Sequence, residues 1–131
     1  MHICYLMVAG EGFDVDDFIS KSKLGRDSKN LLIWHKGEQF RRKERKNSGF
    51  MLEICEVESV GIEEQAQKAI VFLRENFEEL KQLVEQTDTT DSYLQFVIDK
   101  RDVANQNDLF PAELVRLSGS LGLGILLSQY A

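Results

Sequence analysis

The chain has 131 residues, of which 16 are basic and 22 acidic, so its formal net charge at pH 7 is −6. Apolar residues make up 43% and charged residues 29%, which excludes a disordered chain, because disorder needs low hydrophobicity with high net charge. Nucleic-acid binding depends on neutralising phosphates with Lys and Arg, so the acidic balance argues against nucleic acid as the default partner. The length favours a single domain over residues 1–131.

Two further features indicate the compartment. No apolar run reaches the roughly 18 residues that a membrane-spanning helix needs, and the first residues lack the pattern of a secretory signal. We therefore expect no membrane contact and a cytoplasmic location. Cys4 and Cys55 each lie in an apolar run, which predicts two small buried side chains. A disulfide between them would require neighbouring strands with matching geometry.

The chain opens with a strand and a short helix. Residues 2–9 form an almost unbroken apolar run, which predicts a central strand covered on at least part of both faces. Asp14 has the position of a helix N-cap. The apolar spacing after it predicts a helix from about Val15 to Lys23 that ends near Gly25.

Two strands are expected next, around an irregular polar segment. Residues 31–34 predict a short strand, and Asn47-Ser48-Gly49 are turn formers. Residues 50–57 predict a strong strand. Its two glutamates do not alternate with the apolar residues, so we expect either a partly wet face or a bulge.

The second half contains the clearest helix. Between residues 62 and 86 apolar side chains recur every three or four positions, which predicts one long amphipathic helix packed on a sheet. A polar turn at 87–91 and a strand at 93–98 follow. After a charged loop, residues 110–121 predict a short helix closed by glycine, and residues 123–130 predict a last strand.

This order of elements predicts a mixed α+β fold. The first six elements match the βαββαβ order of a ferredoxin-like sandwich, and the extra C-terminal helix and strand extend it. We therefore expect a mostly antiparallel sheet with helices on one face.

Three segments carry a family resemblance. They are the acidic helix start Gly12-Phe13-Asp14-Val15-Asp16-Asp17, the segment Trp34-His35-Lys36-Gly37, and the tail from Phe110 to Leu117 that leads through Gly122 to Tyr130. Together they resemble the bacterial family catalogued as domain of unknown function 4279, although the segment from Phe40 to Ser48 is more basic than that family's pattern. The resemblance implies a bacterial domain of this fold and transfers no catalytic residue. Such domains often sit near toxin genes, which implies an immunity-type role.

The most unusual local feature is the segment 36–46. It contains six basic and two acidic residues, a net charge of +4, whereas the rest of the chain carries −10. Such a segment can bind a phosphate, an acidic protein surface or RNA, and nearby aromatic rings can add stacking. A solvated hairpin loop without a specific partner is the plain alternative. The candidate binding residues are Trp34, His35, Lys36, Arg41, Arg42 and Arg45.

No catalytic or metal-binding signature accompanies that segment. The two histidines, His2 and His35, are far apart in sequence, and no Cys or His pair has the spacing of a metal site. His35 can act as a general base only if a carboxylate and a substrate converge on it. We therefore predict a protein that is not an enzyme and has no cofactor or metal.

Three functions remain open. The first is a protein-interaction module, with an immunity protein that neutralises a toxin as its narrower form; the charge contrast between the basic segment and the acidic long helix favours it. The second is a small-ligand or nucleic-acid-binding domain that uses residues 34–46. The third is a homodimer formed through the sheet face that the helices leave open.

Overall fold

The structure is a computed structural model that describes residues 2–24, 30–59, 61–86 and 91–131. Its elements in chain order are β1 (His2–Gly10), α1 (Val15–Lys21), β2 (Leu31–Trp34), β3 (Gln39–Phe40), β4 (Lys43–Glu44), β5 (Ser48–Val57), α3 (Glu63–Glu75), α4 (Phe77–Gln86), β6 (Asp91–Asp99), α5 (Ala112–Leu121) and β7 (Gly124–Tyr130).

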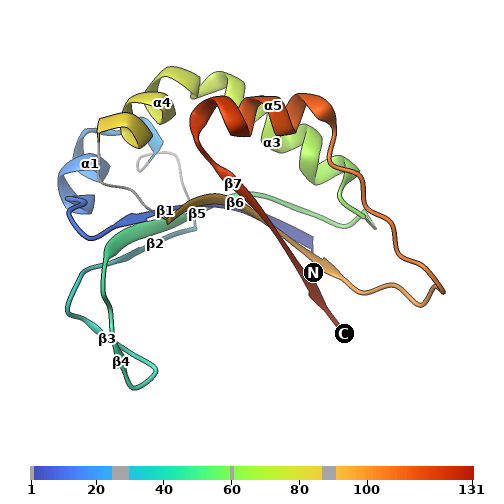
Figure 1. Ribbon diagram of the computed structural model, residues 1–131, viewed down its shortest axis with the longest axis horizontal. Helices are drawn as coiled ribbons and strands as arrows, with labels where there is room; N and C mark the ends of the chain where they lie inside the picture. The colour runs from blue at the N-terminus through green and yellow to red at the C-terminus, as the bar shows by residue number, and fades with distance from the viewer. Residues whose placement is uncertain (1, 25–29, 60, 87–90) are drawn as a thin grey trace.

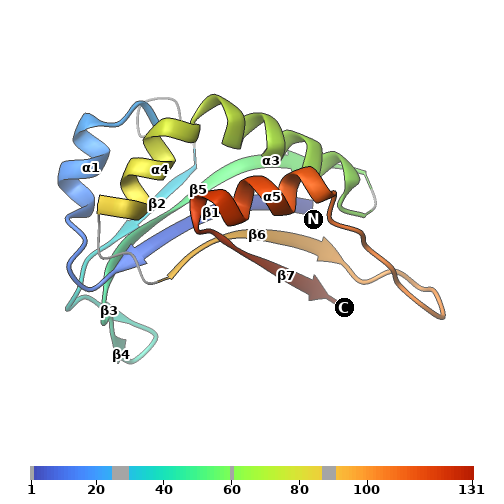
Figure 2. The ribbon, with the colours of Figure 1, turned by 45° about the horizontal axis from the view of Figure 1, so that its top comes forward.

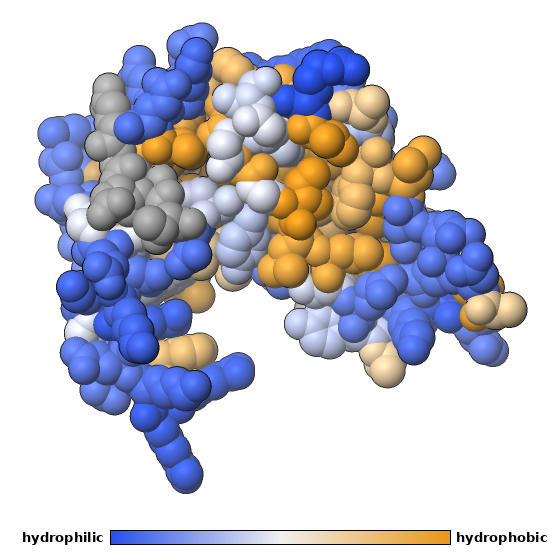
Figure 3. All heavy atoms as spheres, in the orientation of Figure 1, coloured by the Kyte–Doolittle hydropathy of each residue, from blue (hydrophilic) through white to orange (hydrophobic). Residues whose placement is uncertain are grey.

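Within the described residues, five strands form one sheet in the order β2-β5-β1-β6-β7. Neighbouring strands are antiparallel except β6 and β7, which are parallel. The described helices lie together over one face, and the sheet arches so that the other face is hollow (Figures 1, 2 and 3). The predicted α+β class with a mostly antiparallel sheet is therefore present, but this five-strand order is not that of a plain four-stranded βαββαβ sandwich.

β1 lies in the middle of the sheet, as its apolar run predicts. Cys4 and Leu6 point toward the helices and are fully buried. Asp14 caps α1, because its carboxylate accepts a hydrogen bond from the backbone N–H of Asp17 at 3.1 Å and so satisfies one donor that a helix start leaves unpaired. The helix ends two residues earlier than predicted, and the predicted stop near Gly25 lies outside the described residues.

A bulge interrupts the pairing of β1 with β5. Cys4 faces Cys55 and Tyr5 faces Glu53, so Ile54 is the extra residue. This bulge is one of the two irregularities that the sequence predicts for this strand. Cys4 and Cys55 are free thiols that face each other on neighbouring strands, and burial raises the pKa of both.

The predicted long helix over 62–86 is divided at Asn76 into α3 and α4. The side-chain amide of Asn76 donates to the carbonyl of Phe72 at 2.9 Å. The backbone N–H of Asn76 donates to the same carbonyl at 3.1 Å, so Asn76 is the C-cap of α3. The apolar spacing continues across the break, so Leu73 and Leu80 both stay fully buried.

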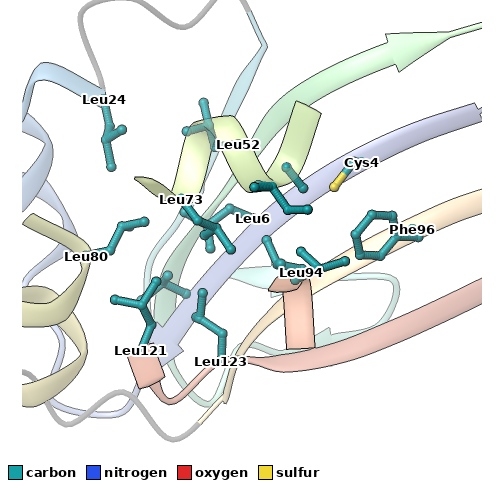
Figure 4. Packing of buried hydrophobic residues seen from close by; sticks show 14 of the residues in the cluster. Cys4, Leu6, Leu24, Leu52, Leu73, Leu80, Leu94, Phe96, Leu121 and Leu123 are labelled. Atoms are coloured by element: carbon teal, nitrogen blue, oxygen red, sulfur yellow. The ribbon is translucent and has the colours of Figure 1, made fainter. Parts of the chain in front are cut away.

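The core fills the space between the helices and the covered face of the sheet (Figure 4). Fully buried side chains come from each layer, including Leu6 of β1, Leu80 of α4 and Phe96 of β6. Fully burying one such side chain stabilises the fold by roughly 1.5–3 kcal/mol. These contacts hold the sheet in place and so position the surfaces on its edges.

The C-terminal elements lie within two residues of their predicted bounds. Gly122 closes α5 with a φ of 76°, and the backbone N–H of Leu123 donates to the carbonyl of Ser118 at 2.8 Å. The predicted polar turn at 87–91 lies outside the described residues except for Asp91, which begins β6. Among the described helices, none is both long and apolar enough to cross a membrane.

Candidate interaction surface

The basic segment 36–46 folds as a β-hairpin, which we call the basic hairpin. Its short strands pair Gln39 with Glu44 and Phe40 with Lys43. The ladder continues toward the sheet, where the backbone N–H of Gly37 donates to the carbonyl of Arg45 at 2.9 Å. The hairpin projects from the end of β2 and β5, away from the helices (Figures 1 and 2).

The turn at the tip consists of Arg41 and Arg42, which both have positive φ, 48° and 67°. A type I′ hairpin turn requires positive φ at both central residues, and Asn or Gly normally occupies them. A side chain in the left-handed region costs roughly 1–2 kcal/mol per residue. The tip thus displays two exposed guanidinium groups at a conformational cost, and strain of this kind is concentrated at functional positions.

Arg45 is held between two aromatic rings at the base of the hairpin. Its guanidinium carbon lies 4.9 Å from the ring centroid of Trp34 and 4.1 Å from that of Phe40. Arg41 lies over the same Phe40 ring at 5.2 Å. The buried Trp34 is fixed in turn, because its indole N–H donates to Oδ1 of Asn47 at 3.0 Å. Cation–π contacts of this kind are worth roughly 0.5–1 kcal/mol at exposed sites, and together they order the hairpin.

Gly49 leaves room for the ring of Trp34. The two residues are paired across β2 and β5. A Cβ at Gly49 would lie 2.5 Å from the carbonyl oxygen of Val8 and 2.7 Å from Cζ2 of Trp34, so no side chain fits. Asn47-Ser48-Gly49 are turn-forming residues, but Ser48 and Gly49 begin β5 instead of forming a turn. Gly49 is needed because Trp34 and the backbone of Val8 lie so close to it.

His35 ties the basic hairpin to α1. Its Nε2 lies 2.8 Å from Oδ2 of Asp16, and its Nδ1 contacts the carboxylate of Glu38. The hydrogen bond to Asp16, followed by that to Glu38, raises the pKa of His35 above its ordinary value. Because both ring nitrogens are engaged, neither is free to take a proton from a substrate. This geometry favours a structural role over that of a general base, and we call the contact of His35 with Asp16 the latch.

A concavity of about 380 Å³ opens on the basic hairpin. It is lined by Phe40, Asn47 and five charged side chains, four of them basic: Arg41, Lys43, Glu44, Arg45 and Lys46. Figure 3 shows this part of the molecule as a hydrophilic projection on one side of the hollow under the sheet. The arrangement presents positive charge around a shallow, polar surface that suits an anionic group.

The neighbouring part of the open sheet face has the opposite charge. A hollow of about 570 Å³ there is lined by apolar side chains such as Leu32 and Met51 and by two acids, Glu53 and Glu56. Burial raises the pKa of the Tyr5 hydroxyl, which also lines this hollow, and the two acids raise it further. A polyanion extended from the hairpin along the sheet would meet these carboxylates.

Three of the six predicted binding residues belong to one stack: Arg45 lies between Trp34 and Phe40, and Arg41 lies over Phe40. The other three do not join it: His35, Lys36 and Arg42. The sequence pattern did not point to Asp16 or Asn47, which anchor the hairpin through side-chain hydrogen bonds. Asp16 had a sufficient explanation as an acid at a helix start, so nothing marked it as a partner of His35.

In the part of the chain that the structure describes, no three His, Cys, Asp or Glu side chains gather as metal ligands would. No protein-family model, curated protein or solved structure matches the chain. The family resemblance therefore stays a prediction from the sequence.

Proposed function

We propose that the chain is a non-catalytic protein-interaction module whose basic hairpin binds an acidic surface of a protein partner. The observation that carries this proposal is the exposed Arg41-Arg42 tip, which keeps two positive φ angles on a hairpin braced by Arg45 between Trp34 and Phe40. An ordered, strained, positively charged projection is a recognition feature, because bracing the charges in advance reduces the ordering that binding requires.

A protein surface suits the hairpin better than RNA does. The two acids in the neighbouring hollow, Glu53 and Glu56, repel a strand that continues along the sheet. A compact acidic patch can contact the hairpin without meeting them. Complementary charge of this kind speeds association and gives specificity.

We also infer that the segment from β1 to β6 is a ferredoxin-like unit, with the basic hairpin as an insertion and α5 with β7 as an extension. The order β2-β5-β1-β6 and its antiparallel pairs support this inference. Free thiols at Cys4 and Cys55 support a reducing, cytoplasmic location.

A narrower proposal is an immunity-type role in which the partner is a toxin. The exposed faces of α3 and α4 support it, because they present acids that suit a basic toxin: Glu63, Glu64, Glu75, Glu78 and Glu85. This version places the contact on the helices instead of the hairpin. The same set of variants distinguishes the two.

The test is capture of partners from a lysate of the native host by three forms of the chain. One is the wild type, one carries Arg41→Glu with Arg42→Glu, and one carries Glu78→Lys with Glu85→Lys. Each double reverses two charges at exposed positions, so the net charge changes by the same amount in opposite directions. We expect a captured protein that the tip variant loses and the helix variant keeps, with binding that weakens as salt is added.

Three results would count against the hairpin as the contact. They are capture that both doubles retain, loss only in the helix variant, and capture of RNA alone. Loss only in the helix variant would transfer the contact to α3 and α4.

A further inference from the structure

β7 is an open edge of the sheet, since no described strand lies beyond it. The backbone N–H of Lys100 donates to the carbonyl of Tyr130 at 2.7 Å, so that carbonyl points toward β6. Bonding direction alternates along a strand. The N–H and C=O groups of Ile125, Leu127 and Gln129 therefore point away from β6 and form an unpaired row.

β7 has none of the features that prevent an edge strand from pairing with another chain. Natural edges are protected by charged residues, proline, bulges or short length. The seven residues Gly124–Tyr130 contain no charge and no proline, and their register with β6 has no shift. The opposite edge differs, because β2 has only four residues and leads into the basic hairpin.

The helix beside β7 has a matching outer face. Exposed residues of α5 recur at 112, 115, 116 and 119, which is one side of a helix. Val115 is 50% exposed, and a Cβ at Gly119 would meet no atom within 4 Å. Only Arg116 carries a charge in this row, whereas the exposed sides of α3 and α4 are rich in charge.

Uncharged side chains flank the β7 edge on both faces of the sheet, and we call them the uncharged band. Those of α5 lie over the covered face, whereas Leu126 and Tyr130 of β7, which are exposed by 41% and 58%, lie on the open face. Figure 3 shows mainly hydrophobic and neutral atoms along the course that β7 takes in Figure 1. Since each chain carries −6, contact between the acidic surfaces of two copies is opposed by charge, whereas the uncharged band adds no such repulsion.

We propose that a second copy of this chain pairs with β7 about a two-fold axis. An antiparallel pair centred on Leu127 places it opposite the copy's Leu127, and Ile125 opposite the copy's Gln129. Each outward N–H and C=O then bonds an identical row, as a two-fold interface requires. The two sheets become continuous, and the α5 helices of the two copies lie side by side.

This dimer goes beyond the proposed function and is independent of it. β2 and β7 are the opposite edges of the sheet, so both basic hairpins stay free at the far ends. Failure of one proposal leaves the other standing.

Sedimentation velocity from low to high micromolar concentration tests the dimer. We expect the wild type at twice the chain mass of 15.0 kDa. Gln129→Pro removes an N–H that points away from β6, so no hydrogen bond within the sheet is lost, and Val115→Lys puts a charge on the band. Each should weaken the dimer by roughly tenfold or more. The matched control is Val71→Lys, because Val71 on α3 is 52% exposed and Val115 is 50% exposed. It should leave the dimer intact.

Amide hydrogen exchange on the wild type supplies a readout that needs no substitution. We expect protection of the Ile125, Leu127 and Gln129 amides that rises with protein concentration. A strict monomer, a dimer in which these three amides stay unprotected, or equal weakening by Val71→Lys and Val115→Lys would overturn the proposal. Circular dichroism melts identify any variant that fails to fold.

Discussion

The guanidinium carbon of Arg45 lies 4.1 Å from the ring centroid of Phe40 and 4.9 Å from that of Trp34. Phe40 belongs to the projecting hairpin and Trp34 to the sheet, so one side chain connects the two. The charge of Arg45 is thus used inside the molecule. The charges at the tip, on Arg41 and Arg42, stay exposed, although Arg41 also lies over the Phe40 ring at 5.2 Å.

Replacing Arg45 with alanine should loosen the basic hairpin and leave the sheet folded. Two cation–π contacts are lost, which corresponds to about 1–2 kcal/mol of local stability. We expect hairpin amides to exchange several-fold faster and the fluorescence of Trp34 to shift, with little change in the melting temperature. Lys43→Ala is the matched control, because Lys43 is a neighbouring basic residue that takes part in none of the cation–π contacts among the described residues. Equal effects of the two substitutions would contradict the bracing role.

Relieving the backbone strain at the tip should make the basic hairpin more stable and abolish binding of the protein partner. Arg41→Asn with Arg42→Gly gives the turn residues that positive φ favours, so the hairpin should gain about 1 kcal/mol or more. The same variant should lose the protein partner, because the tip charges are gone. Amide exchange measures the first effect and partner capture the second. A less stable hairpin would show that the left-handed turn is not a source of strain.

The contact between His35 and Asp16 predicts a pH dependence at the root of the hairpin. The bond to Asp16, followed by that to Glu38, raises the pKa of His35 above 6.5. A pKa raised by folding stabilises the folded state fully below the unfolded pKa, and this stabilisation is lost as pH rises through the folded pKa. The latch should therefore weaken above that pH.

A ring-proton NMR titration of His35 measures this effect directly. Asp16→Asn should lower the pKa of His35. Asp17→Asn should not, since Asp17 lies on the same helix turn but pairs with Lys21. An unchanged pKa of His35 in the Asp16→Asn variant would show that the latch does not form.

Gly49→Ala should destabilise the whole fold. The added Cβ meets the Val8 carbonyl oxygen and the Trp34 ring at distances that no real contact allows, and overpacking of this kind costs about 1–3 kcal/mol. Gly119→Ala is the control, because its Cβ meets nothing and alanine favours a helix. Urea unfolding at low protein concentration should therefore move in opposite directions for the two variants. A Gly49 variant as stable as the wild type would show that the strands can separate there.

Elements defined by a long apolar pattern could be predicted from the sequence. The run at 2–9 and the alternation of Leu94, Phe96 and Ile98 both follow from burial, and all three of those side chains are fully buried. The division of the long helix could not be predicted from the pattern, because apolar spacing is unchanged across Asn76. The division falls at Asn76, a weaker helix former whose side-chain amide bonds the carbonyl of Phe72.

The basic hairpin was harder to predict, because its turn uses residues that are not turn formers. Arg41 and Arg42 carry no local signal for positive φ, whereas Asn47 and Gly49 do carry turn signals and lie elsewhere. The charge of the segment was visible in the sequence. Its bracing was not, since the contact of Arg45 with Trp34 depends on how β2 and β5 pair.

The most direct test of the central claim is an NMR titration of the ¹⁵N-labelled chain with a glutamate-rich peptide. If the basic hairpin binds acidic protein surfaces, amide shifts should concentrate in residues 36–46 and disappear in the Arg41→Glu, Arg42→Glu variant. Shifts spread over α3 and α4, or shifts that persist in that variant, would contradict the account.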